Sequence, residues 1–139
     1  MTGKSFILFT TIVFSSCGSN VKISKSPEVI RAIYDTGYSG AYFSFKEDST
    51  FEWFSGSALG ASDTYQGKYL IRDSLISLDK TGFDQVVKST ELLITTKHPN
   101  PRGIEGDYLI QVNKNGKFLD STLIFTIIVN MRDSNTRKK

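Results

Sequence analysis

The stretch Gly40–Ser55, GAYFSFKEDSTFEWFS, decides the fold. In its first half Phe43 and Phe45 stand at alternate positions, and in its second half Phe51 and Trp53 do the same. Alternation of apolar and polar residues predicts strands that present one face to a core. A short polar segment joins the two runs, so they are expected to pair as a hairpin whose apolar face carries the four aromatic rings.

The same pattern continues on the C-terminal side. Thr64–Arg72 places Gly67, Tyr69 and Ile71 on one face, and Leu75–Leu78 returns after a short turn as a second hairpin. Short runs bounded by turn residues predict further strands in the rest of the chain. They lie at Gln85–Lys88 (weakly), Leu92–Lys97, Tyr108–Asn113, Lys117–Leu119 and Leu123–Val129.

Many short strands joined by tight turns indicate an all-β domain. We expect a small antiparallel barrel or half-open sandwich of about eight or nine strands. Pro27–Tyr34 fits either a short N-terminal helix or an extended lead-in. Leu123–Val129, LIFTIIV, is almost continuously apolar, so we expect it to be buried on both faces or to meet another element with its outer face.

The two hairpins resemble the small lipocalin-like domains of bacterial lipoproteins, which share a glycine-led first strand and a Gly-x-Tyr hairpin. The resemblance implies a lipocalin-like β domain at residues 34–130, and it implies the fold more than an activity. The matching residues are Gly40, Tyr42, Phe43, Phe45, Asp48, Thr50, Phe51, Gly67, Tyr69, Ile71, Asp73, Leu75, Ile76 and Leu78.

The N-terminus has the pattern of an export signal. Lys4 precedes the apolar run 5–14, which is too short to span a bilayer as a helix, and small residues follow up to Cys17, the only cysteine. Three interpretations are open: an ordinary secretory signal cut near Ser16, a cytosolic element, or a lipidated cysteine. A lone exported thiol would risk pairing between molecules, which favours lipidation.

The segment Phe14-Ser15-Ser16-Cys17 resembles the lipobox of bacterial lipoproteins. The resemblance implies that the chain is cut before Cys17 and that acyl chains on this residue hold the protein at a membrane. Residues 1–16 would then be the signal peptide, and 17–33 the lipidated cysteine, tether and lead-in. No acidic residue lies between Cys17 and Glu28, and by resemblance this implies the outer membrane, facing the periplasm.

Charge gives no sign of a nucleic-acid partner. Residues 17–130 have a net charge of −1, and the tail 131–139 has a net charge of +3. No basic face is expected on the domain, and the simplest interpretation of the tail is a solvated terminus.

The residue types that carry most chemistry are scarce. His98 is the only histidine and lies in a predicted Pro-rich loop. Metal sites need clusters of His, Cys, Asp or Glu, and a serine triad would have to use His98. We therefore expect no metal, no cofactor and no enzyme activity.

The most prominent feature is the concentration of aromatic residues between Tyr34 and Tyr69. Most are expected to be core, but a subset could line a barrel mouth or a sheet face: Tyr42, Trp53, Phe54 and Tyr65. The leading hypothesis is a lipid-anchored binding module for an apolar molecule or an envelope protein. The alternative is an assembly-accessory lipoprotein that recruits a larger envelope protein. An aromatic cavity would favour the first, and a filled core with an exposed apolar strand the second.

Overall fold

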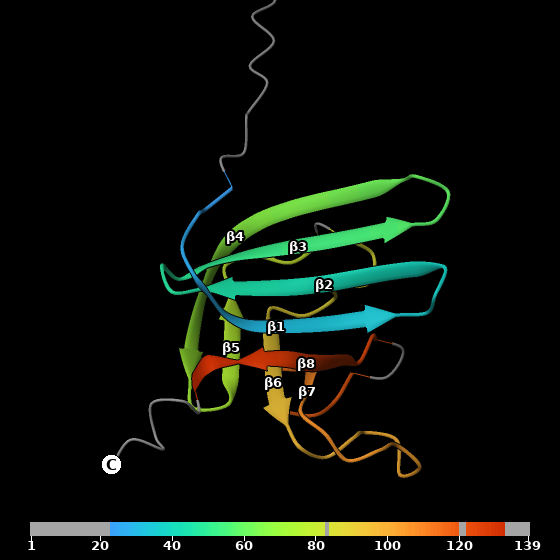
Figure 1. Cartoon of the computed structure of the whole chain (residues 1–139). Coiled ribbons are helices and arrows are strands. Elements are labelled where there is room, and N and C mark those ends of the chain that lie inside the picture. The colour runs from blue at the N-terminus through green and yellow to red at the C-terminus, as the bar shows by residue number, and fades with distance from the viewer. Residues whose placement is uncertain (1–22, 83, 120–121, 133–139) are drawn as a thin grey trace, which may run out of the picture.

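The chain folds into a closed barrel of eight strands in a computed structural model, which describes residues 23–82, 84–119 and 122–132 (Figure 1). Each strand is antiparallel to the next, and the last pairs with the first. The strands are β1 Glu28–Asp35, β2 Ser39–Lys46, β3 Thr50–Ser57, β4 Ser62–Arg72, β5 Leu75–Leu78, β6 Glu91–Thr95, β7 Tyr108–Val112 and β8 Phe125–Asn130. The prediction of an antiparallel barrel built from hairpins is confirmed.

Two segments differ from their expected secondary structure. Pro27–Tyr34 is not helical, because all but its first residue belongs to β1, which pairs with β2 and β8. The barrel therefore begins at Glu28, before the expected domain start at residue 34. The weak strand expected at Gln85–Lys88 is wrong, since this stretch forms a turn and an irregular segment between β5 and β6. The strand expected at Lys117–Leu119 is reduced to a single bridge between Val112 and Phe118.

Alternation along β2, β3, β4 and β5 directs one set of side chains into the barrel, as the two predicted hairpins require. Phe43 and Trp53 are paired across β2 and β3, with ring centroids 4.6 Å apart, and Phe125 of β8 lies 5.3 Å from Phe43. Trp53 is 1% exposed, so its predicted burial beside the phenylalanines is confirmed. The barrel interior is filled by Ile30, Ala32, Ala41, Phe43, Phe45, Phe51, Trp53, Ile76, Leu78, Val87, Leu92, Leu109 and Phe125.

A second apolar cluster lies on the outer side of β7. Tyr108, Ile110 and Val112 share this side, as expected, and Phe118 and Ile124 from the segment between β7 and β8 pack against them. β7 is therefore buried on both faces.

The expectation that LIFTIIV is buried on both faces or covered by another element is wrong. Phe125 points inward, but Ile128 is 54% exposed. Ile128 sits at an irregularity in the pairing of β8 with β1, where Val129 is opposite Arg31 and Ile127 is opposite Ala32. The shift comes after Ile127, so Ile128 keeps the outward position that regular alternation gives it, and its exposure shows that no described element covers this face.

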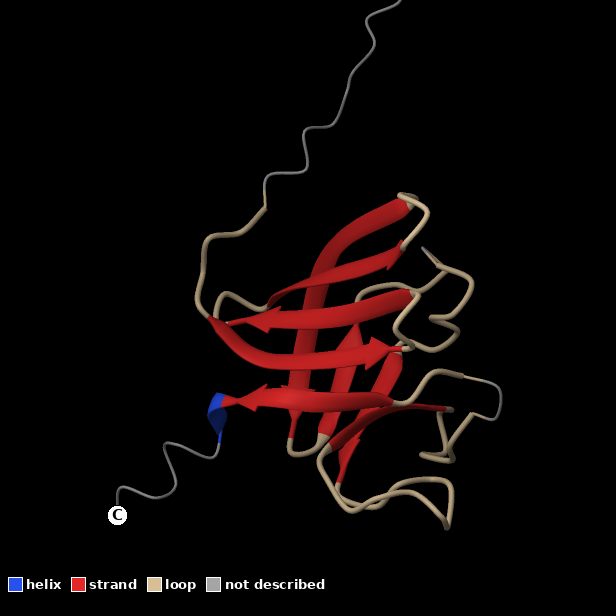
Figure 2. Cartoon of the chain, turned by 45° about the vertical axis from the view of Figure 1, so that its right-hand side comes forward, coloured by secondary structure: helices blue, strands red, loops and turns tan. Residues whose placement is uncertain are grey.

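Successive strands run in opposite directions, so the connections between them lie alternately at the two ends of the barrel (Figures 1 and 2). We call the end that carries the described termini the terminal end; it also carries the β2–β3, β4–β5 and β6–β7 connections. We call the opposite end the distal end. It carries the connections 36–38, 58–61, 79–90 and 113–124.

The β5–β6 connection, residues 79–90, closes part of the distal end. It places Val87 in the core and is held by Gln111 of β7, which is completely buried. The Gln111 side chain accepts the backbone N–H of Lys88 at 2.7 Å and donates to the carbonyl of Val86 at 2.8 Å. A buried amide that binds backbone groups fixes a connection that has no strand of its own.

The first described residues are attached to the turn between β2 and β3. The Lys46 Nζ donates to the carbonyl of Ser24 at 2.6 Å, and the Ser24 hydroxyl donates to Asp48. The backbone N–H of Glu47 donates to the carbonyl of Pro27. Hydrogen bonds from Ser24 and from Thr50 lower the pKa of Asp48. Part of the expected tether therefore lies against the barrel.

Candidate functional site

The four aromatic residues singled out from the sequence do not form one surface. Tyr42 and Phe54 are opposite each other in the β2–β3 pair and point outward. Trp53 and Tyr65 are opposite each other in the β3–β4 pair, and both belong to the interior cluster. The barrel wall separates the two pairs.

The outer pair is part of a network of charged groups. The Tyr42 and Phe54 rings are stacked with centroids 5.2 Å apart, and the Arg31 guanidinium lies 5.3 Å from the Tyr42 ring. The Tyr42 hydroxyl donates to Glu52 at 2.7 Å. Burial, this hydrogen bond and the charge of Glu52 raise the pKa of Tyr42 to about 12. The half-buried outer pair therefore stiffens the sheet and keeps a neutral phenol beside a carboxylate.

The inner pair connects the core with the distal end. The Trp53 Nε1–H donates to Asp84 Oδ2 at 2.9 Å, so the indole is held at its polar edge by the β5–β6 connection. A second oxygen of the same carboxylate, Oδ1, accepts the backbone N–H of Val86 at 3.0 Å. Trp53 is therefore a core residue that lies below the distal end, and it does not line a ligand cavity.

Hollows lie on the rim of the distal end. A cavity of about 400 Å³ opens above the core, between the ends of β1–β4 and the β5–β6 connection. It adjoins one of about 690 Å³ beside the connection and one of about 350 Å³ between the β1–β2 and β3–β4 tips. We call these together the distal groove; its walls include Tyr34, Asp35, Phe54, Ser55, Asp63, Asp84, Val86, Lys88 and Leu123.

Sequence reasoning did not find the distal groove as a site. Its acidic residues come from separate segments: Asp35 ends β1, Asp63 lies in β4 and Asp84 in the β5–β6 connection. The sequence did contain one indication of this site. Asp63 is separated from the inward residues Tyr65 and Gly67 by two and four positions, so it lies on the same face of β4 as they do. A charged residue at an inward position near a strand end is expected at a barrel rim.

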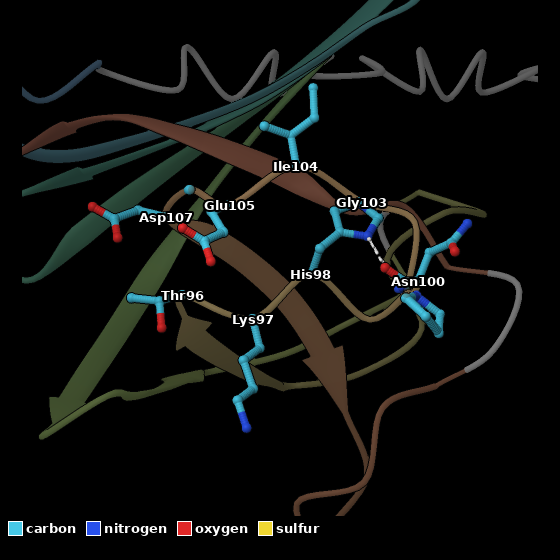
Figure 3. A pocket seen from close by; sticks show the side chains of 10 residues that line it. Thr96, Lys97, His98, Asn100, Gly103, Ile104, Glu105 and Asp107 are labelled. Atoms are coloured by element: carbon cyan, nitrogen blue, oxygen red, sulfur yellow. Dashed lines mark hydrogen bonds between the residues drawn. The ribbon is translucent and has the colours of Figure 1, made fainter.

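His98 lies in a solvent-facing loop at the terminal end, between β6 and β7. Its Nδ1 accepts the backbone N–H of Asn100 at 3.0 Å, and its ring packs edge-on against Tyr108. In Figure 3 the ring is turned toward Asn100, while Lys97 and Asp107 extend in other directions. This loop borders a shallow hollow of about 690 Å³, but its polar groups do not converge on one point.

No family model, no curated protein and no solved structure matches this chain. The function must therefore be argued from the barrel and its rim.

The described residues offer few groups for catalysis or metal binding. Within residues 23–82, 84–119 and 122–132, no three His, Cys, Asp or Glu side chains lie close enough to hold a metal ion. In the same residues no helix has the length and apolar character needed to cross a membrane. Cys17, the expected lipidation site, and most of the tail 131–139 lie outside the described residues.

Proposed function

We propose that this protein is a lipid-anchored, non-catalytic module of the cell envelope that binds a protein partner on the outside of its barrel. The filled interior carries this proposal. Trp53, Phe43, Phe45, Phe51 and Phe125 occupy the space in which a barrel of this size would hold a small ligand. A filled barrel supports a protein partner over an apolar molecule held inside.

The anchor is proposed from the sequence around Cys17 and its resemblance to a lipobox. An eight-stranded up-and-down barrel is the architecture of lipocalins, which supports the resemblance of the two hairpins to lipocalin-like lipoprotein domains. Because Ser24 is bonded to the turn between β2 and β3, only residues 18–23 separate Cys17 from the barrel. Six extended residues reach about 20 Å, so the terminal end would lie close to the membrane.

Recruitment of a larger envelope protein, the alternative from the sequence, is favoured by one further observation. Ile128 on the outer face of β8 and Met131 just after it are both more than half exposed. Both side chains are therefore available for apolar contacts with a partner protein.

The anchor is tested by fractionation. The wild-type protein is expected to stay with washed membranes, because several acyl chains give stable attachment, and Cys17→Ser is expected to be released. A Cys17→Ser protein that stays with the membranes would contradict the anchor.

Partner binding is tested by placing a photo-crosslinking amino acid at exposed sites on different faces of the full chain. Suitable sites are Leu59, Leu70, Ile104 and Ile128. At least one site is expected to give a discrete cross-linked protein in cells. Native mass spectrometry of the same protein is expected to show no non-covalent lipid. The absence of cross-links at every site, or a lipid retained in the barrel, would contradict the proposal.

A further inference from the structure

The distal groove consists of three hollows with overlapping linings: two lie on the inner side of the sheet edge, and the one beside Asp35 and Phe54 lies on its outer side. The central cavity shares Ser55, Asp63, Asp84 and Val86 with the cavity beside the β5–β6 connection. It shares Gly40, Gly56, Ser57 and Ala61 with the cavity between the tips. Hollows on both sides of a sheet edge suit an extended segment that lies across the edge rather than a compact ligand.

The charge of the groove is negative. Three carboxylates line it, from Asp35, Asp63 and Asp84, and Lys88 is the one cation among the described lining residues. Among the described residues, ion pairs link only Arg31 with Glu28 and Lys46 with Glu52, so the groove carboxylates are not neutralised by such pairs. A concave surface of one sign attracts a partner of the opposite sign.

Apolar side chains flank this charge. Tyr38 in the β1–β2 tip is 83% exposed, and Leu59 in the β3–β4 tip is 96% exposed. The backbone N–H of Ala58 donates to the carbonyl of Tyr38 at 2.8 Å, so the two tips are held together. Exposed aromatic and aliphatic side chains on a fixed support beside a groove are typical of a protein-binding site.

We propose that the distal groove docks an extended, basic segment of a partner polypeptide. Lysine or arginine side chains of the segment meet Asp63 and Asp84, and an apolar residue between them contacts Tyr38 and Leu59. The proposal rests on the protein-binding function proposed above and names its surface and the chemistry of the partner. Both described termini leave from the opposite end, so an N-terminal anchor leaves this groove free.

The test uses the full chain in neutral detergent and a labelled synthetic hexapeptide, acetyl-Val-Lys-Leu-Lys-Val-Lys-amide. Its control replaces every lysine by glutamate. Trp53, the only tryptophan, reports binding at the groove because its indole is bonded to Asp84. The lysine peptide is expected to bind and to change the Trp53 emission, and added salt is expected to weaken it. The glutamate peptide is expected not to bind.

Charge reversal locates the contact. Asp63→Lys is expected to weaken binding about tenfold, since it places like charges together, and Asp63→Asn is expected to have a smaller effect. Asp63 is exposed at the rim, and the neutral variant covers the case in which the reversed charge disturbs the fold. Glu105→Lys at the terminal end is the matched control and is expected to change affinity less than about twofold.

Three results would overturn the proposal. They are no binding of the lysine peptide at millimolar concentration, binding without a change in Trp53 emission, and equal weakening by Asp63→Lys and Glu105→Lys. If the peptide fails while cellular cross-links form at Ile104 or Ile128, the protein-binding function stands and the groove is not its site. If no position cross-links, the proposed function itself fails.

Discussion

Individual residues of the interior have fixed roles, because the barrel leaves little spare space. Gly67 illustrates this: the Phe51 ring lies where a Cβ on Gly67 would be, at 2.6 Å, and Asp79 Oδ1 is equally close. The Phe51 ring therefore crosses β4 at the one residue without a side chain. Gly40 differs, since the nearest atom to its Cβ position is the Tyr34 carbonyl at 3.6 Å.

These two glycines give a matched pair. Gly67→Ala is expected to lower the free energy of unfolding by about 1–3 kcal/mol, because the new methyl group overlaps the Phe51 ring. Gly40→Ala is expected to change it by less than about 0.5 kcal/mol. Urea unfolding followed by circular dichroism measures both, and equal effects of the two substitutions would contradict the packing described for Gly67.

Trp53 is the largest fully buried side chain. Trp53→Ala is expected to cost about 3–5 kcal/mol, since it leaves a cavity beside Phe43 and Phe125 and frees Asp84 from its indole partner. Leu59→Ala, at an exposed tip, is the control and should cost less than about 0.5 kcal/mol. An unchanged melting temperature for Trp53→Ala would show that Trp53 is not part of the core.

At the scale of the elements, pairing between strands selects a secondary structure where the local sequence fits more than one. The alternation in β2–β5 was readable from the sequence because one face is buried and the other is wet. Glu28–Asp35, in contrast, has apolar spacing that fits a helix or a strand, and only its pairing with β2 and β8 selects the strand. Alternation puts Ile128 on the outer face of β8, but the local pattern of LIFTIIV does not reveal that this face stays uncovered among the described residues.

The site was less predictable than the fold for the same reason. Alternation correctly placed Trp53 on the apolar face of its strand and Tyr42 and Phe54 on the opposite face, so the expected single surface of Tyr42, Trp53, Phe54 and Tyr65 was inconsistent with that pattern. The distal groove is formed by segments that are far apart in sequence, so it follows from closure of the barrel and from the path of the connection 79–90.

The β5–β6 connection depends on one side chain of another strand. Gln111→Leu keeps the size of the residue but removes the acceptor for Lys88 and Ser89 and the donor for Val86. Unpaired buried backbone groups cost about 1–3 kcal/mol each. We expect lower stability and faster amide hydrogen exchange at residues 86–89 than in β2. Unchanged exchange there would show that other contacts hold the connection.

The contact between Tyr42 in β2 and Glu52 in β3 makes stability depend on alkaline pH. The pKa of Tyr42 is raised from 10.0 to about 12, so the unfolded chain loses the phenol proton first. The contribution of Tyr42 to stability is complete below pH 10 and is lost between pH 10 and about 12. Burial also raises the pKa of Tyr69, so absorbance titration should show a late step from both tyrosines, and its amplitude should fall in Tyr42→Phe. Tyr38→Phe is the control, and loss of the late step in that variant would contradict the assignment.

At the scale of the whole molecule, the two barrel ends have different surroundings. The described termini share one end, and the distal groove with its exposed Tyr38 and Leu59 is at the other. If Cys17 carries the anchor, the short link to Ser24 holds the terminal end within about 20 Å of the membrane. The groove then points away from the leaflet, toward partners in the adjoining compartment.

This arrangement gives a prediction for the compartment itself. Lys97 and Arg102 lie exposed in the connection between β6 and β7, where trypsin can reach them. For an outer-membrane lipoprotein that faces the periplasm, trypsin added to intact cells should leave the protein uncut, because the outer membrane excludes the protease. After permeabilisation of that membrane, cleavage in this loop should produce two large fragments.

A variant with both sites replaced, Lys97→Gln with Arg102→Gln, tests whether trypsin cuts at this exposed loop or digests unfolded protein elsewhere. This variant should resist cleavage in the loop after permeabilisation. A known periplasmic protein in the same sample is the internal standard: it stays intact while the outer membrane is closed and is degraded once the membrane is permeabilised. Cleavage of the wild-type protein in intact cells, with that standard protected, would place the barrel on the cell surface. The distal groove would then face the medium, and its basic partner would have to be sought outside the cell.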